Sequence, residues 1–571
     1  MTGENRNLIL AIVLSAIVLI GWSFLSDMFL PQQPAPAPVA TQAGAPATVP
    51  AGQVGDVAAT GVQAVRTVPA VLAESPRVRI ETPRLSGSIN LTGARIDDLI
   101  LKDHRVSVED DARPVRLFAP SGTQDGWFAG FGWTGNGAPP PDARWTASAG
   151  TLAPGKPVTL SWQSPANILF QLVVAVDENY LFTVTERVVN RSAGAVALRP
   201  YGFINRTGEG PEAGTNTFNV HRGPLGVLDG TLREGEVDYE DLRDDGPQNY
   251  HSAGGWLGIT DTYWLAALIP PQDAAIEARF TATPDNRFQT DYLTPAVAIE
   301  AGQQHQVVTH LYAGAKEVAQ INAVRDDLGV KLFDRSISWG WFWFIAQPIY
   351  MLLAWLHGIF GNYWLAIVGL TLIVRLILYP VANKQYASMA KMRIFAPKMK
   401  EIQEKYKDDK PRQQTEIMEL YKREKINPLA GCLPILLQIP IFYALYKTLL
   451  ISTEIRHQPG PLWINDLGAP DPLTPINLFG LLPFDPPGFL HLGILPIILG
   501  VTMFLQFRLN PAPMDEIQKK VFAWMPWLFM FMMAPFAAGL QIYWIVNNIV
   551  SILQQWVLMR KYPAPAPAPA K

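Results

Sequence analysis

Apolar stretches long enough to cross a membrane recur along this chain. The first, Leu8–Leu25, holds 18 residues without a charge, and a helix of about that length can span a bilayer. A cleaved signal peptide is the alternative, but the apolar core of such a peptide usually has only about 7 to 15 residues. We therefore predict an uncleaved transmembrane anchor over residues 1–30.

Two adjacent apolar stretches, 339–360 and 363–381, are separated by only two residues. If both crossed the membrane, a basic loop would lie on the same side as an acidic domain, against the positive-inside tendency. The first stretch contains four tryptophans and Pro348, which is typical of a helix that lies in the membrane interface. We predict an interfacial amphipathic helix over 336–361 and a membrane span over 363–381.

Three more apolar stretches follow along the chain: 429–446, 490–507 and 521–559. The last is too long for one crossing, and Pro535 and Gly539 divide it into a hairpin. The pattern therefore predicts a polytopic α-helical membrane protein with six transmembrane helices, five of which form a core over residues 362–560. Both termini and two charged loops, 383–425 and 508–520, are predicted on the cytoplasmic side.

The first half of the last hairpin is short for a membrane span. Residues 521–536 would form a helix about 24 Å long, less than the roughly 30 Å of bilayer hydrocarbon. Local thinning of the bilayer is the expected response to such a mismatch.

Strand patterns dominate the region between the anchor and the core. Residues 31–75 are rich in Pro and Ala and are predicted to be a flexible linker. The segments 170–176 and 180–189 are rich in β-branched and aromatic residues around a short polar turn, which is typical of a β-hairpin. Similar runs recur, so we predict a large periplasmic antiparallel β-sandwich over residues 76–335. Its histidines, at 104, 221 and 251, have no metal-binding spacing and are expected at the surface.

The composition is typical of a membrane protein, and the net charge differs between its segments. Of the residues, 49% are hydrophobic and 17% charged, which favours a membrane protein. Residues 31–330 carry a net charge of −11, whereas 383–425 carry +5. The sole cysteine, Cys432, excludes internal disulfides and Cys-rich metal clusters; it is expected to be a small buried apolar residue. No cofactor or metal is predicted.

Arg375 lies inside a predicted span, twelve residues after Tyr363. An arginine at the centre of a membrane costs about 2.5 to 3.5 kcal/mol on insertion scales, so it must meet water, protein or a partner. Thr371 lies one helical turn earlier on the same face. The alternative is that Arg375 reaches the cytoplasmic interface with its long side chain.

The last span carries a polar stripe at helical spacing, formed by Tyr543, Asn547, Ser551 and Gln554. Gln438, Thr502 and Gln506 add polar groups to two other spans. Together with Arg375 they indicate a hydrated cavity, although polar residues can instead join helices by hydrogen bonds.

A cavity of this kind could serve a solute transporter or a polypeptide. No Asp or Glu lies inside any predicted span, whereas ion-coupled transporters need such groups. The sequence also lacks a GxxxxGK[ST] nucleotide-binding motif. A hydrated groove that receives polypeptide, and from which apolar segments leave sideways into lipid, is the better interpretation.

The basic loop 383–425 is predicted to be a helical hairpin. Two charge-rich helical patterns, 389–406 and 412–425, are broken by Asp-Asp-Lys-Pro. Met399, Ile402 and Tyr406 form an apolar stripe that suits a partner helix. The positive charge fits membrane lipids, or ribosomal RNA and a nascent chain, and the sequence does not decide between them.

Seven motifs in the second half of the chain resemble one known family. They are GNYW at 361–364, TLIVR at 371–375, YP at 379–380, QYASMAKM at 385–392, NPLAGCLP at 427–434, QIPIF at 438–442 and LWINDL at 462–467. They are similar to the YidC membrane protein insertases, which are related to the mitochondrial Oxa proteins. The external segments 254–256 and 312–314 also match.

The resemblance implies a bacterial inner-membrane insertase and chaperone that acts on nascent membrane proteins, alone or with the Sec translocon, and is not an enzyme. It implies that Arg375 lies in a hydrophilic groove open to cytoplasm and lipid, and that Thr371, Tyr543 and Trp544 contact substrate. The family position that matches Trp544 is often tyrosine, so a role that needs a hydroxyl there is not expected.

The carboxyl-terminal segment departs from part of the family. Some members end in a long basic tail that contacts the ribosome, whereas residues 561–571 here are mostly Pro and Ala. Ribosome contact would therefore fall to 383–425. The alternative function, from another class, is a membrane-anchored carbohydrate-active enzyme with its chemistry in the β-sandwich.

Overall fold

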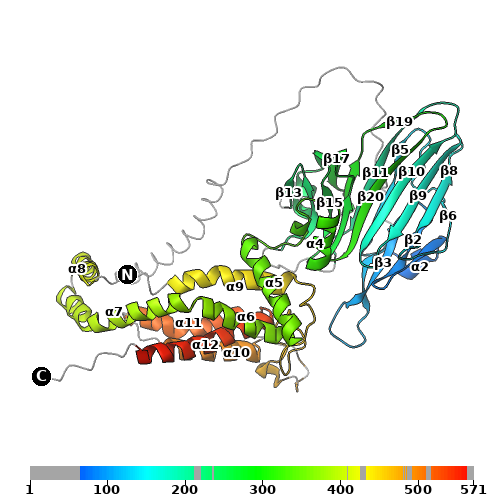
Figure 1. The fold of residues 1–571 in the computed structure, drawn as a ribbon. Coiled ribbons are helices and arrows are strands. Elements are labelled where there is room, and N and C mark those ends of the chain that lie inside the picture. Colours follow the sequence, from blue (N-terminus) through cyan, green and yellow to red (C-terminus); the bar gives the residue numbers. More distant parts are fainter. Residues whose placement is uncertain are drawn as a thin grey trace. The chain divides into compact units, whose positions relative to one another are not determined.

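The computed structural model describes residues 65–561, except 211–219, 235–236, 408, 425–432, 480, 483, 485–491 and 510–515. The described residues form a β-rich region and a helical region (Figure 1). The predicted anchor, most of the linker, Cys432 and residues 562–571 lie outside the described residues.

The β-rich region holds two large sheets. The path of the eleven-stranded sheet is β14 (Gln248–Ala253), β17 (Ala275–Ala282), β18 (Arg287–Leu293), β11 (Val196–Thr207), β5 (Trp127–Gly135), β3 (Arg95–Arg105), β2 (Leu85–Asn90), β1 (Arg77–Glu81) and β7 (Thr151–Leu152), with β19 (Val297–Ile299) beside β11 and β4 (Pro114–Phe118) beside β3. The order of the nine-stranded sheet is β13 (Thr231–Arg233), β12 (Gly223–Leu228), β15 (Trp256–Thr260), β16 (Trp264–Ile269), β20 (Gln304–Ala315), β10 (Leu181–Asn190), β9 (Ile168–Val176), β8 (Val158–Gln163) and β6 (Thr146–Ala147).

The predicted hairpin is confirmed and shows how the sandwich forms. Strands β9 and β10 pair antiparallel, with Phe182 opposite Val176, and every second residue of each is buried. Side chains that alternate between faces in this way give each sheet one apolar face. The two apolar faces meet: Trp133 of β5 lies 5.1 Å from the ring of Phe170 in β9. The β-sandwich prediction is therefore confirmed.

Four short helical segments accompany the strands: α2 (Val68–Leu72), α3 (Tyr239–Asp244), α4 (Val318–Asp327) and the 3₁₀ helix η1 (Phe333–Ser336). The helical region contains α5 (Trp343–Phe360), α6 (Tyr363–Ile377), α7 (Tyr379–Lys405), α8 (Lys410–Arg423), α9 (Leu433–Ile451), η3 (Pro475–Asn477), α10 (Ile494–Leu509), α11 (Glu516–Met533) and α12 (Ala538–Lys561). Helix α12 packs against α6, α9 and α10, and α5 packs against α6 and α9 (Figure 1).

Several helix boundaries follow from local sequence. Helix α6 begins where the side chain of Asn362 accepts a hydrogen bond from the backbone N–H of Trp364, a preferred N-cap arrangement. It ends at Ile377, and the chain bends by 55° into the next helix. Pro380 lies in the first turn of α7, where the missing N–H of proline costs nothing.

The predicted hairpins of the helical region are present. Helices α11 and α12 are separated by residues 534–537, which include Pro535, whereas Gly539 lies within the first turn of α12. Helix α11 spans Glu516–Met533, so it includes charged residues that precede the apolar stretch. Helices α7 and α8 match the two charge-rich patterns, although α7 begins ten residues earlier than predicted.

Among the described residues, helix α5 alone is by itself long and apolar enough to cross a membrane. The bent pair Tyr363–Ile377 and Tyr379–Gln385 passes the same test together, and shorter apolar helices occupy Leu437–Ile451, Ile494–Leu509 and Ala523–Met533. Helix α5 is the one predicted to lie in the interface. The number of membrane crossings stays a prediction.

The expectation of surface histidines is wrong for two of the three. His251 is exposed, but His104 lies edge-on against Trp264 and close to Glu317. His221 is half-buried and hydrogen-bonds the carbonyl of Pro224 at 2.8 Å. The described residues contain no group of three or more His, Cys, Asp or Glu side chains that could hold a metal ion.

Candidate functional site

Helix α6 places Arg375 and Thr371 one turn apart on one face. Thr371 is fully buried, and its hydroxyl donates to the carbonyl of Ile367 in the preceding turn at 2.7 Å. This bond satisfies the hydroxyl within its own helix. Arg375 is half-buried, so its guanidinium lies at the margin of the packed helices.

Arg375 reaches across to helix α12. Its Nε donates to Oδ1 of Asn547 at 2.7 Å, and its Nη2 donates to the Asn547 carbonyl at 3.4 Å. The hydroxyl of Ser551 donates to the same carbonyl at 2.5 Å. Three residues that the sequence singled out thus form one connected polar cluster, which we call the Arg375 cluster. A charged donor strengthens such hydrogen bonds.

A second polar contact joins α9 to α12. The amide of Gln438 donates to the phenol oxygen of Tyr543 at 2.5 Å, and Tyr543 is fully buried. The next residue, Trp544, lies 4.8 Å from the ring of Phe442 and 4.9 Å from the ring of Phe529. Tyr543 and Trp544 therefore both fix the position of α12, one by a hydrogen bond and the other by aromatic packing.

Thr502, another polar residue of the predicted spans, contacts a different part of α12. Thr502 of α10 accepts a hydrogen bond from the amide of Asn548 at 3.1 Å, so it joins two helices. The prediction that Thr502 contributes to the same cavity as Arg375 is therefore not supported. For this residue, the alternative of a hydrogen bond that joins helices applies.

Sequence reasoning missed a second stripe on α12, formed by Gln541, Asn548 and Gln555. Gln541 donates to the carbonyl of Phe536 at 2.8 Å, and Gln555 donates to the carbonyl of Leu509 at 2.8 Å. All three side chains are buried. They recur every seven residues, which is two helical turns, so the spacing that places residues on one face was already visible in the sequence.

The basic hairpin packs as predicted. Met399 is buried and its sulfur accepts a hydrogen bond from the hydroxyl of Tyr421 at 3.6 Å. The amide of Gln413 donates to the carbonyl of Gln403 at 2.8 Å, and the hydroxyl of Tyr406 donates to Glu416 at 3.4 Å. Helices α7 and α8 therefore contact each other along the predicted stripe.

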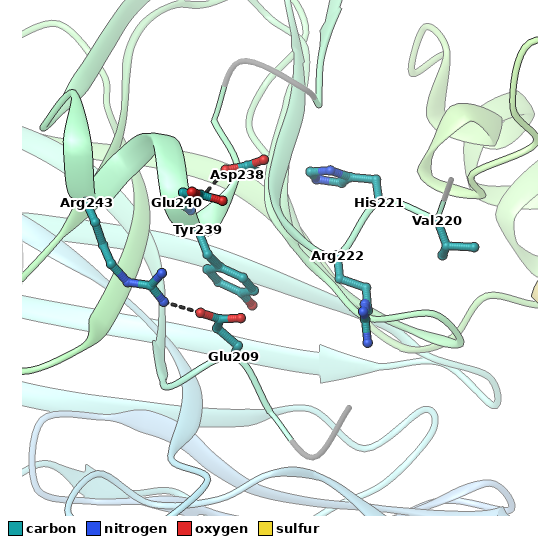
Figure 2. A pocket seen from close by; sticks show the side chains of 8 residues that line it. All are labelled: Glu209, Val220, His221, Arg222, Asp238, Tyr239, Glu240 and Arg243. Atoms are coloured by element: carbon teal, nitrogen blue, oxygen red, sulfur yellow. Dashed lines mark hydrogen bonds and ion pairs between the residues drawn. The ribbon is translucent and has the colours of Figure 1, made fainter. Parts of the chain in front are cut away.

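The β-sandwich contains a polar pocket of 280 Å³ (Figure 2). It is lined by Glu209, Val220, His221, Arg222, Asp238, Tyr239, Glu240 and Arg243. Glu209 forms an ion pair with Arg243, and Asp238 accepts hydrogen bonds from two backbone N–H groups at the start of α3. Burial lowers the pKa of His221 to about 4, so this side chain is neutral at physiological pH.

These contacts bear on the enzyme alternative. Two of the three carboxylates in the pocket hold structural contacts, and a neutral His221 is bonded to a backbone carbonyl. Glycoside hydrolysis needs a pair of carboxyl groups set on either side of the substrate. The pocket therefore favours a structural role for these groups.

Two family models together match most of the chain. A model described as 60Kd inner membrane protein matches residues 355–565. A model described as YidC periplasmic domain matches residues 77–352. The boundary between the two matches falls within α5, close to the predicted boundary between the β-sandwich and the helical core.

Curated relatives match over nearly their full length. A membrane protein insertase YidC from Methylobacterium radiotolerans is 43% identical, over 98% of this chain and 96% of the relative. The protein of the same name from Zymomonas mobilis is 42% identical over the same shares. The sequence comparison thus includes both the β-rich region and the helical region.

Two solved structures are also similar. A crystal structure of an active YidC insertase with its first transmembrane domain resolved is 16% identical, covers 84% of this chain and 92% of its own, and has a TM-score of 0.35. A galactose mutarotase-like protein from Lactobacillus casei is 11% identical, covers 42% of this chain and 99% of its own, and has a TM-score of 0.29. Scores this low add nothing to the sequence matches.

Proposed function

The chain belongs to the YidC family of membrane protein insertases, and we propose that it inserts its clients through a hydrophilic groove lined by the Arg375 cluster. It is a membrane protein insertase and chaperone, not an enzyme. Its family places it in the inner membrane with a periplasmic domain.

The observation that carries the groove proposal is the hydrogen bond between Arg375 and Asn547. A guanidinium among apolar helices needs polar surroundings, because an arginine in hydrocarbon costs about 2.5 to 3.5 kcal/mol. Asn547 and Ser551 supply such surroundings on the facing helix. The same polar surroundings would lower the cost of moving a polar client segment part of the way across the membrane.

Apolar client segments would leave the groove sideways. Helix α6 carries Leu372 and Leu376 on its exposed surface, next in sequence to the buried Thr371 and the half-buried Arg375. Helix α11 likewise exposes Trp524 and Leu528. Exposed apolar side chains on membrane helices favour contact with lipid or with another apolar helix. A client helix could therefore pass from the polar cluster to lipid along these two helices.

The proposed topology has six transmembrane helices, with both termini in the cytoplasm and α5 in the interface. The charge distribution supports it, since the positive segment 383–425 is then cytoplasmic and the acidic β-sandwich periplasmic. The contacts between α7 and α8 support a compact cytoplasmic hairpin.

The proposed partners are nascent membrane proteins, the Sec translocon, the ribosome and membrane lipids, and no small-molecule substrate. Ribosome contact would use the hairpin 383–425, whose net charge of +5 suits RNA.

Insertion by the purified chain tests this proposal. A small single-spanning membrane protein is added to liposomes that contain only this chain, and the membrane-protected fragment is measured after protease treatment. We expect protection that empty liposomes do not give. A folded, reconstituted chain that gives no more protection than empty liposomes would contradict autonomous insertion.

A further inference from the structure

The segment between α9 and α10 exposes large apolar side chains. Leu481 is 80% exposed. Leu478, Phe479, Leu482 and Phe484 are also exposed. Five exposed large apolar side chains so close together in a connecting loop are unusual and favour contact with a membrane or a partner. We call these five side chains the apolar tip.

The base of this loop is firmly attached to the helices. Asp471 is buried and accepts hydrogen bonds from the indole of Trp463 at 2.9 Å and from the backbone N–H of Leu473 at 3.0 Å. Its other oxygen accepts from the N–H of Leu495, in the first turn of α10, at 2.7 Å. The backbone N–H of Gly539 also donates to the carbonyl of Leu467 at 2.9 Å. The apolar tip thus extends from a fixed base.

Local backbone geometry directs the tip. Directly after η3, Leu478 and Phe479 adopt left-handed conformations, with φ of 53° and 62°. This conformation is unfavourable for residues with a Cβ, by about 1 to 2 kcal/mol each. The amide of Asn477 donates to the carbonyl of Phe484 at 3.5 Å and closes the turn. In this strained geometry the side chains of Leu478 and Phe479 are exposed rather than packed in the protein.

The length of α10 indicates what the tip contacts. Helix α10 has 16 residues and is about 24 Å long, roughly 6 Å less than the hydrocarbon thickness of a typical bilayer. In the proposed topology the tip precedes the periplasmic end of this helix. Apolar side chains at that end would fill the missing hydrocarbon depth, which is one response to a short span.

We propose that the apolar tip inserts into the acyl chains of the outer leaflet of the inner membrane. This inference rests on the proposed topology of the insertase. It assigns the tip a lipid contact that anchors the loop at the end of the short helix α10. A hydrophobic protein segment is the other possible occupant, and the experiment below separates the two.

Fluorescence quenching tests this inference on the full-length chain in liposomes. Cys432 is first replaced by Ser, because it is the only cysteine. Leu481→Cys and, separately, Leu478→Cys are then labelled with an environment-sensitive dye. The matched control is Val308→Cys, an exposed position on β20 of the β-sandwich. We expect brominated phosphatidylcholine to quench the label at 481 and 478, and aqueous iodide to quench only the label at 308.

Quenching of the label at 481 by iodide as strongly as at 308 would overturn the lipid contact. A label protected from both quenchers would also overturn it, in favour of a protein occupant. Labelling with a membrane-impermeant maleimide shows whether the lipid contact of the apolar tip or the proposed membrane topology is wrong. If Val308→Cys reacts from the periplasmic side, the topology holds and only the tip is in question; if it does not, the proposed topology fails.

Discussion

The β-sandwich and the helical region each hold an arginine by hydrogen bonds to a neighbouring element, but only the arginine of the β-sandwich is buried. Arg206 of β11 is buried and donates two hydrogen bonds to the carboxylate of Asp261, at 2.7 and 2.9 Å. Its guanidinium also lies 4.2 Å from the ring of Trp127. Arg375 of α6 donates to the amide oxygen and the carbonyl of Asn547.

The two arginines differ in their hydrogen-bond partners and in their exposure. Asp261 binds and neutralises Arg206, so this pair fixes the sandwich without leaving a net charge in its core. Asn547 is neutral, so its contact with Arg375 orients the guanidinium through hydrogen bonds. Arg206 is buried and serves the fold, whereas the half-buried Arg375 lies at the margin of the helices, where a passing polypeptide could reach it.

The largest expected loss of stability comes from breaking the ion pair between Arg206 and Asp261. Asp261→Ala leaves the charge of Arg206 buried without this carboxylate, and such changes cost about 3 to 5 kcal/mol. Thermal unfolding of the full chain in detergent, followed by tryptophan fluorescence, should show a clearly lower transition temperature for the sandwich. The matched control is Asp326→Ala, at an exposed ion pair with Arg325, which should leave the transition unchanged. Equal transitions for both variants would contradict a structural role of the buried pair.

A smaller effect on stability, and one that depends on pH, is expected from the buried carboxyl group of Glu186. Its side chain is 1% exposed, and burial raises its pKa well above the ordinary value of 4.5. The folded state therefore holds the proton more tightly than the unfolded state, so the stability that Glu186 contributes is fully present below about pH 4.5 and is lost as pH rises towards the raised pKa.

Glu186→Gln removes this titration and should reduce the loss of stability between pH 5 and pH 8 by about 1 kcal/mol or more. The measurement is the unfolding midpoint of both proteins at the two pH values. Glu178→Gln, in the exposed turn of the same hairpin, is the control and should follow the unsubstituted protein. A pH dependence that Glu186→Gln leaves unchanged would show that Glu186 does not carry it.

Sequence periodicity predicted which residues share one face of a helix or strand better than it predicted what that face contacts. The stripe at Tyr543, Asn547 and Ser551 was visible because residues four apart share a helix face. Alternation also placed Glu186 in phase with the buried Phe182 and Val184 of β10, so its burial could have been read from the sequence.

The partner of each face depends on long-range packing, which periodicity does not encode. The sequence grouped Thr502 with Arg375, whereas the structure pairs Thr502 with Asn548. It also gave no order for the strands, because β10 pairs with β20, more than a hundred residues away. Proline and capping signals, by contrast, act within a few residues, so the start of α6 at the Asn362 cap follows from local sequence, whereas the charge pattern placed the start of α7 ten residues too late.

The central claim is that the oriented charge of Arg375 assists insertion. The most direct test compares two clients in liposomes, one with an acidic translocated segment and one in which that segment is neutral. For the acidic client, we expect Arg375→Ala to reduce insertion about tenfold, which corresponds to about 1.4 kcal/mol, and Arg375→Lys to be milder. The matched control is Gln555→Ala, on the other stripe of α12, which should insert both clients normally. Full and equal insertion of the acidic client by Arg375→Ala and the unsubstituted protein would contradict the claim.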